Sequence, residues 1–336
     1  MWTISTINSG EHIFLFQLHR KDLIDGYTIP CWGVGLLLYS GKFLVRGGVE
    51  LARHFHLSSL VVGVTVVSFG TSAPELLVSV QAAIGGYPDI SMGNVVGSNI
   101  SNISIVLAIA AIICPVVINK SSLILDWPVM MVFTIILYFL ILNGTLGFWG
   151  GLTIFIMLIF YVNWSIISSR LKSRRNAEKF LSPTIPLYLA IIMIVISTAG
   201  LAFGADWLVE GAAGIARALG VSERVISLSL IAFGTSLPEL VTSSIAAVKK
   251  EADISVGNII GSNIFNIGAV LGITSMIKPL TINQQVIDFD IFWVAGTGVA
   301  LVLVSLPFKR PRLGRIGGFL LILIYMLYLY LIFTRE

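Results

Sequence analysis

The segment FGTSAPELLVS, Phe69 to Ser79, places a glutamate directly behind a proline inside a long apolar stretch. A charged side chain near the centre of a bilayer costs from ~2.5 to more than ~10 kcal/mol, so it is rarely present without a function. The arrangement recurs as AFGTSLPELVTSS, Ala232 to Ser244, where Glu239 follows Pro238. Two acids in a repeated apolar context are therefore the starting point for the fold and for the function.

The composition around these two segments is that of a membrane protein. Of 336 residues, 56% are hydrophobic and 11% are charged, against roughly 25% charged residues in soluble domains. The sequence predicts an all-α membrane protein of about ten transmembrane helices, each able to cross ~30 Å of hydrocarbon. The expected spans lie at about 29–52, 58–84, 90–117, 126–142, 147–168, 186–208, 222–247, 254–277, 288–306 and 314–333.

The basic residues give the expected orientation. The net charge is +4, but Lys and Arg concentrate in alternate loops rather than in a patch for nucleic acid. These loops, near 53, 120, 170–179, 249–250 and 309–315, should be cytoplasmic because short cytoplasmic loops carry the positive excess. Both termini then lie outside, and the protein is expected in the prokaryotic cell (inner) membrane.

The two acidic segments belong to an internal repeat. When residues 68–103 are aligned with 232–267, 21 of 36 pairs are identical without a gap. The halves are a first five-helix repeat (29–168) and a second one (186–336), with a polar N-terminal lead-in (1–28) and a charged cytoplasmic linker (169–185). An odd number of spans separates equivalent helices, so the repeats are inverted in the membrane. Secondary transporters have this architecture, with the ion site near the midplane on interrupted helices.

Oxygen atoms dominate both motifs. Pro74 removes a backbone donor, which should free carbonyls near residues 68–71, and Pro238 should do the same for 232–235. Thr71 and Ser72 share a helix face with Glu75. The segments SMGNVVGSNISNI (91–103) and SVGNIIGSNIFNI (255–267) each add one polar stripe of asparagine and serine. Hydroxyl, amide and carboxylate oxygens suit calcium and sodium, whereas zinc and copper prefer the imidazole and thiolate that these segments lack.

The paired GTSxPEL and GNxxGSNxxN segments resemble the two alpha-repeats of the cation/calcium exchanger superfamily, and most closely those of its prokaryotic sodium/calcium exchanger branch. The resemblance implies a secondary antiporter that exchanges calcium for sodium by alternating access, with no enzymatic activity, no cofactor and no obligate protein partner. Its partners would be the two ions and the lipid bilayer. It also implies an ion site that is formed by Thr71, Ser72, Glu75, Ser98, Asn102, Thr235, Ser236, Glu239, Ser262 and Asn266, completed by the carbonyls of Ser68 and Ala232.

The chain departs from the family pattern at one place. Relatives often carry an aspartate at one of the positions that Asn102 and Asn266 occupy here, so this site has two acids rather than three. The sodium stoichiometry and any potassium requirement stay open. Exchange of calcium or another cation for protons is the alternative function. An intramembrane protease would use an aspartate pair, and a cation channel would need a continuous pore.

Overall fold

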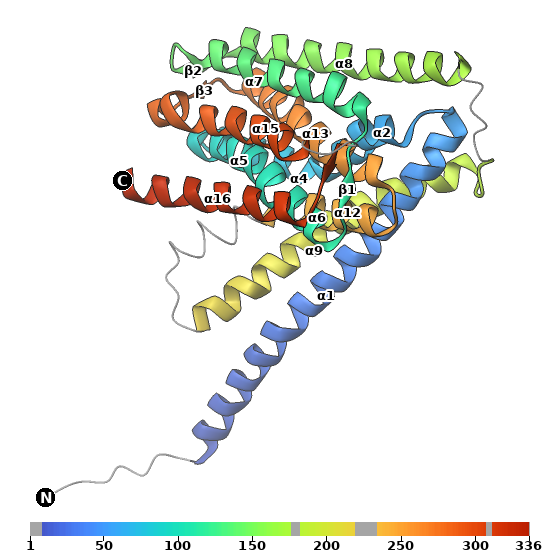
Figure 1. Ribbon diagram of the computed structural model, residues 1–336. Coiled ribbons are helices and arrows are strands. Elements are labelled where there is room, and N and C mark those ends of the chain that lie inside the picture. Colours follow the sequence, from blue (N-terminus) through green and yellow to red (C-terminus); the bar gives the residue numbers. More distant parts are fainter. Residues whose placement is uncertain (1–8, 176–181, 219–233, 307–310, 336) are drawn as a thin grey trace, which may run out of the picture.

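The computed structural model describes residues 9–175, 182–218, 234–306 and 311–335, which are almost entirely helical (Figure 1). Short π-helical segments, labelled η, interrupt several of the helices. In the first half the elements are α1 (Ser9–Phe55), α2 (Ser59–Val62), η1 (Gly63–Val67), α3 (Ser68–Thr71), α4 (Ala73–Ile84), α5 (Pro88–Ser101), η2 (Asn102–Leu107), α6 (Ala108–Ile113), β1 (Val116–Val117), η3 (Ser122–Asp126), α7 (Trp127–Ile141), β2 (Thr145–Leu146) and α8 (Phe148–Arg175).

The second half repeats much of this order. Its elements are α9 (Leu187–Ala218), α12 (Leu237–Val248), α13 (Ala252–Phe265), η5 (Asn266–Leu271), α14 (Gly272–Ile277), β3 (Leu280–Thr281), η6 (Val286–Asp290), α15 (Ile291–Ser305), β4 (Arg312–Leu313) and α16 (Arg315–Arg335). From α4 to α7 and from α12 to α15, every element begins and ends 164 residues after its equivalent, the same spacing that separates Glu75 from Glu239. The sequence repeat is therefore also a structural repeat over these elements.

The expected spans compare with the helices as follows. Within the described residues, seven helical segments are long and apolar enough to cross a membrane, or eight if the bent pair Ser59–Thr71 and Ala73–Ile84 is one span. Helix α1 covers the first expected span and begins at Ser9, inside the stretch expected as a polar lead-in. The span expected at 222–247 lies partly outside the described residues, and α12 forms its C-terminal part. The structure is an all-helical membrane protein, and the count of ten spans stays a prediction.

Two of these segments form the centre of the molecule. Of the most apolar part of Ala252–Ile277, 89% of the residues are buried, and for Pro88–Ile113 the share is 72%, against 17% to 33% in the other five. Glycines allow α13 to cross η1 at close range. A Cβ at Gly257 would lie 2.8 Å from the Leu60 carbonyl oxygen, and one at Gly261 would lie 2.5 Å from that of Val64. Gly93 and Gly97, at the equivalent positions of the first half, have no atom within 4 Å of such a Cβ, so this close packing occurs in the second repeat only.

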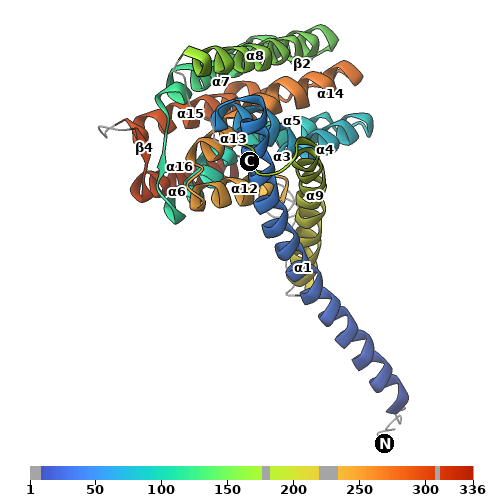
Figure 2. The same ribbon diagram turned by 90° about the vertical axis from the view of Figure 1, so that its right-hand side faces the viewer.

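The short strands of one repeat pair with those of the other. Strand β1 pairs with β4, and β2 pairs with β3, so each strand pair joins one strand from each half. Helices α1 and α9 lie side by side and extend away from the other helices, as the two views agree (Figures 1 and 2). Because every strand pair and the α1–α9 contact connect the halves, the halves form a single interlocked unit around α5 and α13.

Candidate cation-binding site

A break in the helix positions each glutamate. Ser72 separates α3 from α4, and Pro74 lies in the first turn of α4, where proline is tolerated because the first amide groups of a helix have no internal partner. The chain bends by 43° at this break. Pro238 occupies the equivalent place in α12. Glu75 and Glu239 both lie in the first turn of their helices, the end at which the helix dipole favours negative charge.

Both carboxylates are completely removed from solvent. Glu75 and Glu239 each have 0% exposed surface, and their charges are close enough to interact with one another. No basic side chain among the described residues forms an ion pair with either glutamate. Buried charges are stable only when they are paired or bind a cation.

Hydrogen bonds satisfy only part of this cluster. The hydroxyls of Ser72 and Ser262 donate to Oε1 of Glu239, each over 3.3 Å. Oε2 of Glu239 and both carboxylate oxygens of Glu75 are buried without a partner. The two glutamates whose charges interact come from different halves of the chain. The two halves therefore meet at this point.

Asn102 and Asn266, the last asparagines of the two polar stripes, each have an amide group that is oriented by hydrogen bonds. Nδ2 of Asn102 donates to Oδ1 of Asn263 over 3.0 Å, and Nδ2 of Asn266 donates to Oγ of Ser98 and Oδ1 of Asn99, each over 3.0 Å. The Oδ1 atoms of Asn102 and Asn266 are buried without a partner. Their amide groups therefore leave the acceptor oxygen free, which is the atom that a hard cation requires.

The remaining residues expected in the site have the following places. Thr71 donates to Oδ1 of Asn258 over 3.0 Å and lies 3.3 Å from Oγ of Ser262. Thr235 donates to Oδ1 of Asn94 over 3.3 Å. Ser236 and Ser98 are buried. Ala232 lies outside the described residues.

The Ser68 carbonyl was expected to lack a hydrogen-bond partner, but it has one. It accepts the Ser72 amide over 2.9 Å, and the Thr71 hydroxyl, which donates to Asn258, lies 3.3 Å from it. Pro74 removes the donor for the carbonyl four residues back, at Gly70, and so leaves the bond to Ser68 in place.

Four other asparagines connect the elements of the site. Nδ2 of Asn99 donates to the Asn263 carbonyl over 3.2 Å, and Nδ2 of Asn263 donates to the Asn99 carbonyl over 3.0 Å. Asn94 donates to Ser79 over 3.0 Å and Asn258 to Ser243 over 2.9 Å. All four of these hydrogen bonds join different helices. The additional contacts of these asparagines with Thr71 and Thr235 were not expected from the sequence.

The donor set defines what this centre can bind. Five buried oxygens without a partner come from both halves: two from Glu75 and one each from Glu239, Asn102 and Asn266. All five are acceptors, and no three His, Cys, Asp or Glu side chains cluster anywhere in the described part of the chain. An all-oxygen environment with two negative charges fits a hard cation such as calcium or sodium.

Comparison with known proteins agrees with this chemistry. The profile of the family described as sodium/calcium exchanger protein matches residues 27–167 and 189–334. The chain belongs to this family. It is therefore an integral membrane protein, and its family and fold are those of ion exchangers, which are transporters.

Individual relatives match nearly the whole exchanger. CaxA of Alkalimonas amylolytica is 36% identical over 312 residues, which cover 90% of this chain and 97% of the relative. The membrane protein MJ0091 of Methanocaldococcus jannaschii is 35% identical over 308 residues, with coverage of 91% and 97%. A structure of the sodium-calcium exchanger NCX_Mj, soaked with zero Na+ and Ca2+, superposes with a TM-score of 0.79 at 32% identity and covers 92% of this chain and 99% of the other.

Two further pairs of polar residues in the exchanger were not found from the sequence. The Tyr161 hydroxyl donates to Oδ1 of Asp126 over 2.8 Å, and the Tyr328 hydroxyl donates to Oδ1 of Asp290 over 3.1 Å. Each pair fastens the last helix of one half to the π-helical segment before α7 or α15. Asp126 and Asp290 are 164 residues apart, so the repeat spacing could have identified the aspartates, although it could not have identified their partners.

Proposed function

We propose that this exchanger moves calcium in one direction and sodium in the other through one shared site. The site would consist of the residues expected from the sequence: Ser68, Thr71, Ser72, Glu75, Ser98, Asn102, Ala232, Thr235, Ser236, Glu239, Ser262 and Asn266. Two glutamates cannot serve both ions at once, so calcium and sodium would compete for the same oxygens and be carried in separate steps by alternating access.

The unpartnered oxygens carry this proposal. Burying an acceptor without a donor costs about 1–3 kcal/mol, and more for a charged group. Five such oxygens come from both halves, and no basic side chain among the described residues is bonded to them. A cation supplies what all five lack, and a divalent ion balances the charge of Glu75 and Glu239. Sodium has the same preference for oxygen with half the charge, and NCX_Mj is itself named a sodium-calcium exchanger.

The proposed architecture is ten spans in two inverted five-helix repeats, with both termini external. The repeated element order supports it, because elements from α4 to α7 recur from α12 to α15. A reporter fused near Arg174, at the end of α8, should be cytoplasmic, and one near Gly144, in the turn before β2, should be external. Finding both reporters on the same side would rule out this topology.

The coupling ion is tested by transport into proteoliposomes of the purified protein. With sodium inside and calcium-45 outside, uptake should require the outward sodium gradient and stop when sodium is equal on both sides. A proton gradient of either direction, imposed without sodium, should produce no uptake. Uptake driven by the proton gradient alone would assign the chain to proton-coupled exchange, and uptake independent of both gradients would indicate a channel.

A further inference from the structure

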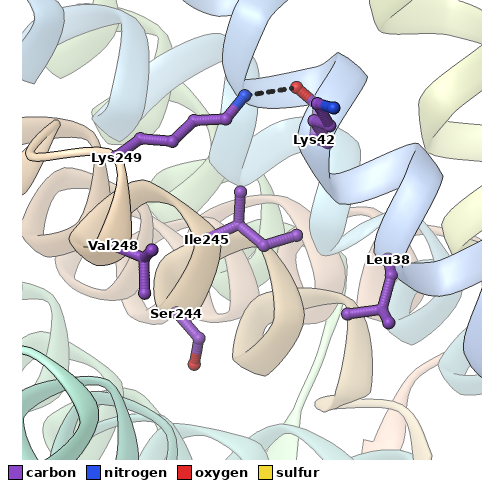
Figure 3. A pocket seen from close by; sticks show the side chains of 6 residues that line it. All are labelled: Leu38, Lys42, Ser244, Ile245, Val248 and Lys249. Carbon is purple, nitrogen blue, oxygen red and sulfur yellow. Dashed lines mark hydrogen bonds between the residues drawn. The ribbon is translucent and has the colours of Figure 1, made fainter.

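A second feature lies apart from the cation site, in a cavity between α1 and α12. Its volume is about 260 Å3, and it is lined by Leu38 and Lys42 from α1 and by Ser244, Ile245, Val248 and Lys249 from α12 and its end. Figure 3 shows the Lys249 side chain extending toward α1 at one end of this space, with Ser244, Val248 and Leu38 around its other side. One end of the cavity is thus basic and the rest is mainly apolar.

The basic end holds three positive charges, and one nearby carboxylate, that of Glu251, acts on the charge of Lys249. Lys249 donates from Nζ to the Lys42 carbonyl over 3.2 Å. Arg46, one turn further along α1, is exposed and acts on the charge of Lys249. None of these three residues forms an ion pair within the described part of the chain. Partial burial, together with the charges of Lys42 and Arg46, lowers the pKa of Lys249 below its ordinary value.

The apolar part lies one helical turn from each lysine. Leu38 precedes Lys42 by four residues and Ile245 precedes Lys249 by four, so each pair shares a helix face. Leu38 and Val248 are 52% and 59% exposed. Ser244, at the end of the cavity away from the lysines (Figure 3), has a buried hydroxyl without a hydrogen-bond partner. Basic groups at the membrane surface, followed by apolar side chains, match in that order the phosphate and the acyl chain of a phospholipid.

We propose that this cavity binds one anionic phospholipid from the cytoplasmic leaflet, with its phosphate at Lys42 and Lys249 and an acyl chain along Leu38 and Ile245. Charge complementarity selects the headgroup, because the positive charges are on the side that the loop charges predict to be cytoplasmic, where anionic lipids attract basic segments. A lipid held here would contact α1 and α12 together. Gly41 already lets these helices approach, since a Cβ there would lie 3.0 Å from Ile245 and from Val241.

Native mass spectrometry of the purified full chain, titrated with dioleoyl phosphatidylglycerol or phosphatidylcholine, tests the proposal. The wild type should bind one phosphatidylglycerol in preference to phosphatidylcholine. The double variant Lys42→Gln/Lys249→Gln should weaken this binding about thirtyfold, the effect of two basic residues near an anionic headgroup. Lys42→Arg/Lys249→Arg should keep it. The matched control Lys120→Gln/Lys172→Gln removes the same charge from two other exposed residues and should bind as the wild type does.

The apolar half of the proposal has its own variants. Val248→Trp and, independently, Leu38→Trp should fill the cavity and reduce phosphatidylglycerol binding while both lysines remain. Unchanged elution and thermal unfolding identify which variants are folded. Equal loss in the Lys120/Lys172 control, equal binding of phosphatidylcholine, or displacement of the lipid by inorganic phosphate in the millimolar range would each overturn the proposal. So would full binding in both tryptophan variants.

Discussion

Glu75 and Glu239 occupy equivalent positions of a repeated sequence, but their carboxylates have different neighbours. Glu239 accepts hydrogen bonds from Ser72 and Ser262, whereas Glu75 accepts none from a side chain. The equivalents of those two serines are Ser236 and Ser98, both buried in the same region. The same residue types at the same spacing therefore do not give the same site twice.

The two serines equivalent to the donors of Glu239 form other hydrogen bonds: the Ser98 hydroxyl donates to the Val95 carbonyl over 3.1 Å, and Ser236 contacts Ser101. The Ser236 hydroxyl lies 3.1 Å from that of Ser101, and Ser101 donates its own proton to the Ser98 carbonyl. A hydroxyl has one proton to donate, so Ser236 is the donor of the pair, and its hydroxyl is not placed to hydrogen-bond to either carboxylate oxygen of Glu75. The residue equivalent to Ser101 in the second half is Phe265, which cannot accept the proton of Ser72.

The largest expected effect comes from removing either charge. Glu75→Gln or Glu239→Gln keeps the shape of the side chain but leaves one carboxylate to balance a divalent ion. Even at an effective dielectric constant of about 20, a unit charge ~4 Å away is worth several kcal/mol, so calcium affinity should fall by ~100-fold or more. Sodium, with half the charge, should lose less.

Calcium-45 flux into proteoliposomes measures the loss of calcium transport in each variant. Competition of sodium with calcium-45 uptake measures the loss of sodium binding. Glu50→Gln, at a buried glutamate of α1 that is paired with Arg53, is the matched control for the same chemical change outside the site. Near-normal calcium flux in Glu75→Gln would remove this residue from the proposed ligand set, even if Glu239→Gln were inactive. The two halves would then differ in function and not only in hydrogen bonding.

The second expected effect concerns charge balance between the halves. Two carboxylates balance one calcium ion or two sodium ions, so we expect exchange without net charge movement and a calcium gradient that does not respond to a membrane potential. Asn266→Asp gives the site a third acid, which lies in the second half of the chain, and should allow a third sodium ion to bind. Each unbalanced charge contributes about 2.3 kcal/mol per 100 mV, equivalent to about a fiftyfold change in the calcium gradient at equilibrium.

A potassium diffusion potential set with valinomycin provides the measurement. The calcium gradient of the wild type should stay constant from zero to 100 mV, and that of Asn266→Asp should change. Asn163→Asp is the control, because it adds the same charge at an exposed residue of α8 that is outside the proposed ligand set. A voltage-dependent wild type would show that the site carries more charge than its two glutamates account for.

The third effect separates the two amide ligands. Asn266 donates to two acceptors, Ser98 and Asn99, whereas Asn102 donates to Asn263 alone. Alanine at either position removes one oxygen from the site, but at Asn266 it also leaves more neighbours without a donor. At about 0.5–1.5 kcal/mol for each hydrogen bond, Asn266→Ala should lose several-fold more calcium affinity than Asn102→Ala. Calcium titration of transport rates gives the ratio, and equal losses would contradict the difference between the halves.

The sequence predicted the elements that are built from local signals. Pro74 and Pro238 mark the two helix breaks, and the repeat spacing places Glu75 opposite Glu239, because proline chemistry and apolar periodicity act within a few residues. It could not predict the pairing of β1 with β4, or the partner of Asp126, since these contacts join segments that only the folded chain brings together. The roles of Ser101 and Phe265 were missed for the same reason: each depends on which hydroxyl reaches it from the other half.

The last and smallest expected effect tests the explanation of the asymmetry directly. Ser101→Ala removes the acceptor that now holds the Ser236 hydroxyl, so we expect the Ser236 side chain to turn away from α5 and donate to Glu75, as Ser72 donates to Glu239. The ion-free site would gain one hydrogen bond that calcium must displace, and calcium affinity should fall about three- to tenfold. Ser91→Ala, a buried serine of the same helix whose hydroxyl has no partner, should leave the affinity unchanged. Combining Ser101→Ala with Ser236→Ala should return calcium affinity toward that of Ser236→Ala alone, because the new donor is then absent. If Ser101→Ala binds calcium as the wild type does, the different surroundings of Glu75 and Glu239 have some other origin than the Ser101 hydroxyl.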